Sequence, residues 1–345
     1  MIDNNSMVQR LTALWALSEA AFGGVLHAFQ VPFTGLFINA SAVIFITLIA
    51  YYSQNKSALI KATLVVLIVK ATVSPHTPLN AYFAVTMQGL LGLLLFRSLK
   101  YFTASAIVLG FLTMFQSALQ RIIVLTIIFG NNLWESIDIF GNYLVDQITF
   151  LDLNQSQLNI SLWLISGYVI IHLIAGVLVG IFSAKIPGWV KVEMEENHDF
   201  SAVINSKIQE QSKTNRKRKN RFLRPGSIAI IMLALSIIIL TYVFPQFNDS
   251  QGKMAIIMIV RSIVIMFLWY AIAGPLLRKV YYRYLANKKS KYTEEVEQSV
   301  RLMPFLKVMV VNSWTASKKY PGLSKFKRFI TLLIVTLFTV ELPQE

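Results

Sequence analysis

The sequence predicts an all-α protein, a polytopic bundle of membrane helices. The 345-residue chain is 55% hydrophobic and only 14% charged, with a mean hydropathy of +0.57. Soluble proteins carry about 25% charged residues. Apolar segments close to the roughly 20 residues that cross a bilayer recur along the chain. The alternating pattern of a membrane β-barrel is absent, so helices are the expected spanning elements.

The apolar segments predict eight membrane helices, at 11–30, 33–53, 57–73, 80–97, 102–130, 161–183, 226–246 and 255–277. The first contains Glu19 and His27 and shows no cleavage site, so we interpret it as a retained helix and not a signal peptide. Three regions follow: a six-helix N-terminal domain (1–183), a basic linker (184–225) and a part with two or three membrane helices and an amphipathic tail (226–345).

Connections that contain Lys or Arg alternate with connections that contain neither. The positive-inside rule then predicts cytoplasmic N- and C-termini and a cytoplasmic linker, in a multi-pass protein of the cell (inner) membrane. The turn at 30–32, the stretch Lys70–Gln88 and the acidic segment 131–160 are expected outside. Apolar residues recur at helical spacing in 131–160, which indicates an amphipathic helix on the membrane surface or over the bundle.

Several kinds of chemistry are excluded or disfavoured. The chain has no cysteine, which excludes disulfides and thiol catalysis, and it has no Walker A sequence for binding ATP. Two isolated residues, His27 and His76, are weak evidence for a metal, so we predict neither a metal nor another cofactor. The net charge of +15 and the basic run 216–224 indicate contact with anionic membrane lipid, and not with nucleic acid.

The stretch Lys70–Gln88 is polar although it joins two apolar segments. Pro75 and Pro78 stiffen the turn around His76. The turn is either a ligand site at the outer face or a connecting loop that meets water. The candidate ligand-binding residues are His27, Gln30, Lys70, His76, Asn80, Tyr82, Gln88 and Gln120.

Charges within the predicted helices need partners. An intramembrane charge costs about 2.5–3.5 kcal/mol even on the lenient insertion scale. Glu19 and Arg121 are therefore candidates for an ion pair. Lys70 either extends to the membrane surface or binds an anionic ligand.

Small residues recur every fourth position in the first helix, at Ala16, Ala20, Gly24 and Ala28, and predict a helix-packing surface. Gly176 and Gly180 form a second such pair. With six helices, an inner N-terminus and an outer polar site, residues 1–183 resemble the substrate-binding S components of energy-coupling-factor (ECF) vitamin transporters. Ala16-x-x-x-Ala20 is similar to the family motif that packs on the transmembrane T component. The resemblance implies uptake of a vitamin, cofactor precursor or metal, driven by separate ATPase subunits.

Residues 226–345 faintly resemble a T component. The segment 316–322 is similar to the family's coupling motif, which implies coupling roles for Ala316, Lys318, Lys319 and Gly322, although no arginine precedes Gly322. The cationic, partly apolar tail 278–345 is expected to dock on a soluble ATPase or to rest on anionic lipid.

The leading hypothesis is a non-enzymatic uptake subunit that binds a small molecule at the outer face. The alternative is an integral membrane enzyme acting on a lipid or isoprenoid, with His76, Lys70 and the outer acidic residues as candidate groups. A third possibility is an assembly or lipid-handling protein.

Overall fold

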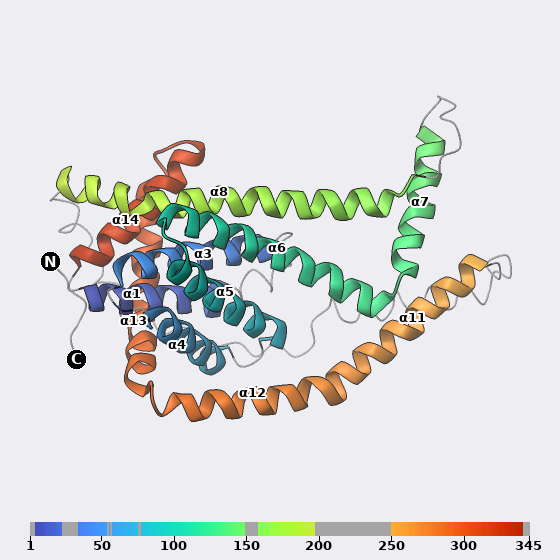
Figure 1. Ribbon diagram of the computed structural model, residues 1–345, viewed down its shortest axis with the longest axis horizontal. Coiled ribbons are helices and arrows are strands. Elements are labelled where there is room, and N and C mark those ends of the chain that lie inside the picture. The colour runs from blue at the N-terminus through green and yellow to red at the C-terminus, as the bar shows by residue number, and fades with distance from the viewer. Residues whose placement is uncertain are drawn as a thin grey trace. The chain divides into compact units, whose positions relative to one another are not determined.

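The computed structural model describes residues 4–22, 34–53, 55, 57–74, 77–148, 158–196 and 250–340. Every regular element within these ranges is a helix, which confirms the predicted all-α class (Figure 1). Five of the described helices are long and apolar enough to cross a membrane, at 35–52, 79–98, 102–129, 160–195 and 256–289. The predicted span 226–246 and most of the predicted linker lie outside the described residues.

The chain divides into two compact units. Unit 1 comprises residues 1–117, 171–214 and 278–345, and unit 2 comprises 118–170 and 215–277. The elements wholly within unit 1 are α1 (Asn4–Leu17), the π-turn η1 (Ser18–Phe22), α3 (Thr34–Tyr52), α4 (Ala58–Val73), α5 (Leu79–Ser98), α13 (Thr293–Ser317) and α14 (Gly322–Thr339). Parts of α6 (Phe102–Phe129), α8 (Ile160–Glu196) and α12 (Gly274–Lys289) complete it.

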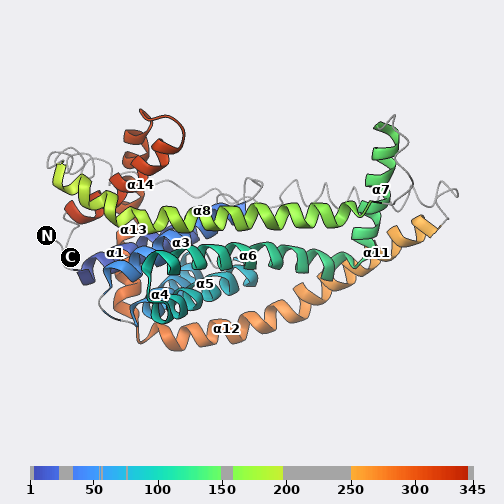
Figure 2. The ribbon, with the colours of Figure 1, turned by 45° about the horizontal axis from the view of Figure 1, so that its top comes forward.

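Helix α1 lies at the centre of unit 1 and packs against α3, α4 and α13 (Figures 1 and 2). Its residues from Leu11 to Ala16 are all buried, so the helix is covered around its whole circumference over this length. A helix that is apolar and enclosed on all sides is stabilised chiefly by packing, at about 1.5–3 kcal/mol for each fully buried large side chain.

The tail helices α13 and α14 form part of this core. The sequence indicated amphipathic helices on the inner membrane face, but their apolar faces pack within unit 1. Leu306 and Met309 of α13 are fully buried. All residues from Thr331 to Leu337 of α14 are also buried, with at most 4% of each exposed. Helix α1 is buried on every side, and α3 and α4 cover only part of it. The tail helix α13 supplies further apolar surface that covers α1.

Hydrogen bonds and ion pairs join α1, α4 and α8 to the tail helices α13 and α14. The Arg10 guanidinium donates to the carbonyl oxygens of Leu337 at 2.5 Å and of Val340 at 2.8 Å. Carbonyls in the last turn of a helix have no partner within it, so Arg10 caps α14. Lys61 forms an ion pair with Glu295, and Arg328 forms one with Glu193.

In unit 1, α6 and α8 cross at glycines. A Cβ on Gly110 would lie 2.2 Å from the carbonyl oxygen of Gly176, and one on Gly180 would lie 2.5 Å from the Cα of Ile107. The two backbones therefore touch, which is the use that the sequence predicted for Gly176 and Gly180.

Unit 2 contains α7 (Asn132–Ile148), α11 (Ser250–Leu268), η3 (Trp269–Ala273) and the remaining parts of α6, α8 and α12. Gly130 ends α6 with φ of +76°, a conformation that favours glycine. Helix α7 falls where the sequence predicted an amphipathic helix. Its Asp138 accepts hydrogen bonds from the backbone N–H and hydroxyl of Ser161 at 2.6 and 2.8 Å, which fixes the start of α8.

Three expected spans differ in their bounds from the helices, the first because α1 begins at Asn4 and not at residue 11. Helix α8 continues through Pro187 to Glu196, so the first residues of the predicted linker are helical. Helices α11, η3 and α12 follow one another without a break from Ser250 to Lys289. The polar residues that follow an apolar segment can continue the same helix. Hydropathy marks the end of the apolar segment, and it therefore does not locate the end of the helix.

Candidate functional site

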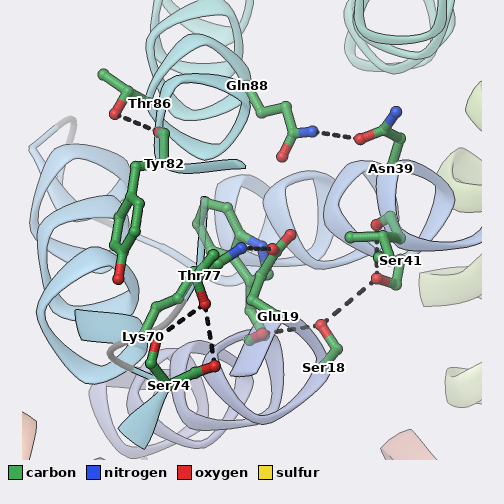
Figure 3. Close-up of polar contacts among 12 residues, drawn as sticks. Ser18, Glu19, Asn39, Ser41, Lys70, Ser74, Thr77, Tyr82, Thr86 and Gln88 are labelled. Carbon is green, nitrogen blue, oxygen red and sulfur yellow. Dashed lines mark hydrogen bonds and ion pairs between the residues drawn. The ribbon is translucent and has the colours of Figure 1, made fainter. Parts of the chain in front are cut away.

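A cluster of buried polar side chains lies where η1, α3, α4 and α5 meet in unit 1 (Figure 3). At its centre, Lys70 Nζ donates to Glu19 Oε2 at 2.6 Å, and the two side chains are only 5% and 2% exposed. Lys70 stands in the last turn of α4. Glu19 stands in the π-turn, a local widening of the helix that occurs often at functional sites.

The ion pair differs from the one that the sequence suggested. Glu19 pairs with Lys70 and not with Arg121, which belongs to unit 2 and interacts there with Tyr168. The pairing also removes the expectation that Lys70 reaches the membrane surface. Both charges are enclosed, and each compensates the other.

Tyrosines border the ion pair. The Lys70 ammonium lies 6.0 Å from the centre of the Tyr82 ring. The Tyr82 hydroxyl lies 3.1 Å from the Tyr282 hydroxyl, and the Tyr82 ring centre lies 5.2 Å from that of Tyr281. Neither α12 tyrosine was predicted from the sequence as a site residue. The signal was a run of three tyrosines around Arg283 at the end of an apolar segment, where aromatic residues are common in any case.

An amide pair forms the α3–α5 side of the cluster. Gln88 Nε2 donates to Asn39 Oδ1 at 2.7 Å, and both side chains are buried. The Ser41 hydroxyl donates to the Ser18 hydroxyl oxygen, with 3.4 Å between the two oxygens. Asn39 was also missed, although an amide in the middle of an apolar helix is itself a signal for a polar contact.

Some buried polar atoms of this region have no hydrogen-bond partner among the described residues. They include the acceptors Glu19 Oε1 and Gln88 Oε1 and the donor Trp15 Nε1, which lies one turn before Glu19. A buried polar atom without a partner costs about 1–3 kcal/mol. A group that supplied hydrogen bonds to these atoms would therefore remove this cost.

Three of the predicted ligand-binding residues are buried in unit 1: Lys70 lies against the Tyr82 ring, and Gln88 pairs with Asn39 on the other side of the cluster (Figure 3). Asn80 is exposed at the start of α5, and Gln120 is half-buried in unit 2; both have interactions of their own. His27, Gln30 and His76 lie outside the described residues, as does Gly24. Their roles stay predictions.

The packing and coupling residues occupy different surroundings. Ala16 and Ala20 are buried, as a helix-packing stripe requires. Ala316 is half-buried, whereas Lys318, Lys319 and Gly322 are exposed around the turn between α13 and α14. Gly322 has φ of +53°, so the turn itself accounts for a glycine there.

Among the described residues, no three histidine, aspartate or glutamate side chains are grouped to hold a metal ion. Comparison of the chain with protein-family models, curated proteins and solved structures found no match.

Proposed function

We propose that the protein is a membrane uptake subunit that binds a small solute in the buried cluster around Glu19 and Lys70 and works with a separate ATPase. The observation that supports this most is the enclosed ion pair, bordered by tyrosines and by polar atoms without partners. Ionisable groups inside membrane helix bundles are expensive, and they commonly mark solute or ion pathways. The resemblance of residues 1–183 to ECF S components suggests the same role.

The cluster favours a solute with several hydrogen-bonding groups. Glu19 Oε1 and Gln88 Oε1 call for donors, and the tyrosine rings offer a flat apolar surface. The ion pair is neutral as a whole, so it can hydrogen-bond to a polar solute without demanding that the solute carry charge.

The contacts of the tail bear on topology and coupling. Arg10, Lys61 and Glu193, which the positive-inside rule places at the cytoplasmic side, each contact the tail at α13 or α14. This agreement supports cytoplasmic N- and C-termini. Since the apolar face of α14 is buried, the part of α13 and α14 that we expect to meet an ATPase is the exposed turn around Lys318, Lys319 and Leu323.

Untargeted mass spectrometry of small molecules released from the purified protein tests solute binding. We expect a molecule that co-purifies with the wild type and is lost in Gln88→Leu, which removes a buried acceptor without changing charge. Thr103→Leu, at an exposed position of α6, is the control and should retain it. If nothing is enriched with the wild type over Gln88→Leu, the solute-binding role is wrong.

Single cysteines test topology, since the chain has none of its own. An impermeant maleimide should label Tyr143→Cys on α7 in intact cells, and Lys318→Cys only after lysis. Both positions are exposed in their units. Labelling of Lys318→Cys in intact cells would contradict the proposed orientation while leaving solute binding untouched.

A further inference from the structure

A second polar cleft lies in unit 1, between the first turns of α1, α4 and α13. Its volume is about 340 Å³, within the range of roughly 300–1,000 Å³ that holds small ligands. It lies at the opposite end of α4 from the buried cluster: Lys61 lines it, and Lys70 is nine residues further on, about 13 Å along the helix. The two sites are therefore separate.

The cleft combines an apolar interior with a polar edge. Ala62 and Val65 are buried and line its inner part, together with Val8. Three amides line it as well: Asn5 and Gln9 from α1, and Asn55 from the turn before α4. Such a mixture is typical of sites that enclose a small molecule and orient it by a few polar groups.

Among the described residues that line the cleft, two are charged: the cation Lys61 and the anion Glu295. Lys61 Nζ lies 2.5 Å from Glu295 Oε1, and the two side chains are 48% and 22% exposed. Partial burial by itself would raise the pKa of the Glu295 carboxyl, but hydrogen bonds and the charge of Lys61 outweigh it, so the pKa is lowered. Glu295 is thus an anion at neutral pH, and the charges of the two described side chains, Lys61 and Glu295, cancel.

The amides are available to a ligand. Asn55 Oδ1 accepts hydrogen bonds from the Ser57 backbone N–H at 3.0 Å and from its hydroxyl at 2.9 Å, which leaves the Nδ2 group as a donor. In the described part of the chain, the side chains of Asn5 and Gln9 make no hydrogen bond. Amides both donate and accept, so they suit a ligand with ends of opposite charge.

We propose that this cleft binds a small zwitterion, with its ammonium group against Glu295 and its carboxylate or phosphate against Lys61. A ligand with only a negative charge would be repelled by Glu295, and one with only a positive charge by Lys61. A zwitterion converts one ion pair into two. Free amino-acid-like molecules and the phosphoethanolamine headgroup of a lipid share this chemistry. The inference does not depend on the proposed uptake function.

Thermal unfolding and calorimetric titration of the full-length protein in a non-ionic detergent test the proposal. Glycine and O-phosphoethanolamine are the zwitterionic probes, and acetate and ethylamine carry each charge alone. We expect a zwitterion to bind and the single-charge compounds not to bind. Lys61→Gln or Glu295→Gln should weaken binding roughly tenfold or more, the scale of one lost charge-assisted contact. The charge-swapped double variant K61E/E295K should restore it with the ligand reversed.

Nanodiscs distinguish the source of the ligand. If phosphatidylethanolamine stabilises the wild type more than phosphatidylglycerol, and the soluble probes do not bind, the ligand is a lipid headgroup. Binding of a soluble probe assigns a free metabolite. The proposal fails if neither source has an effect, if acetate or ethylamine binds as well as glycine, or if K61Q/E295Q binds the zwitterions unchanged.

Discussion

Replacement of Lys70 by methionine should strongly destabilise the protein. Methionine matches the lysine side chain apart from the terminal ammonium, and it leaves the Glu19 carboxylate, which is 2% exposed, without its counter-charge. Removing one partner of a buried pair typically costs about 3–5 kcal/mol, because the remaining charge stays away from water. The free energy of unfolding, measured by SDS titration in mixed micelles, should fall by that amount.

The double variant E19Q/K70M separates the pair from its function. With both charges removed, the stability should return to within about 1–2 kcal/mol of the wild type or exceed it, since neutral replacements of buried pairs are often tolerated. Lys61→Met is the matched control, because this lysine of the same helix is half exposed and its ion pair is worth at most about 1 kcal/mol. If Lys70→Met is as stable as Lys61→Met, the argument from burial is wrong. Loss of the co-purifying solute from the stable double variant would assign the pair to binding.

Three further changes have defined outcomes. Gly176→Leu should separate α6 from α8 and lower the melting temperature by several degrees, whereas Gly167→Leu, with nothing within 4 Å of its Cβ position, should not. Arg10→Ala should cost about 1.5–3 kcal/mol, because it removes a charged donor from two carbonyls of α14, and limited proteolysis should then cut α14 first. The ion pair between Lys61 and Glu295 stabilises the fold at pH values above the ordinary carboxyl pKa, and this stability is lost as the pH falls through the lowered pKa of Glu295. When stability is measured across an acid titration, the wild type should show this small loss and Glu295→Gln should not.

Much of the fold follows from local patterns in the sequence. Length and hydropathy predict α3, α4, α5 and α6 to within a residue or two at each end, and the spacing of Gly176 and Gly180 predicts a close helix crossing. The acidic segment after residue 130 contains the amphipathic helix that its periodicity indicated. Such features depend on neighbours within a few turns, which a single sequence displays.

The partners in the candidate site depend on contacts between distant segments. Lys70, Tyr82 and Gln88 are visible as polar residues in apolar surroundings, but nothing local shows that Lys70 meets Glu19. Tyr282 is two hundred residues from Tyr82, with which it shares a hydrogen bond. The periodicity of apolar residues indicates which face of a helix is buried, but it does not identify the segment that packs against that face.

The same limit applies to the tail. The apolar positions of the tail indicated a face that would be buried, and we expected this face to contact lipid or an ATPase. The cover is α1 and its neighbours, which belong to the same chain.

The bonds from Arg10 to Leu337 and Val340 bridge 327 and 330 residues, which has a consequence for how the protein is made. A ribosome adds about 5–20 residues each second, so α1 waits roughly 15–65 seconds before its last neighbours emerge. During that interval Leu11 and Trp15 of the first helix depend on molecules other than the tail for cover. A chain released before α14 would keep this surface uncovered, so early termination should yield a product that quality control removes and not a smaller working domain.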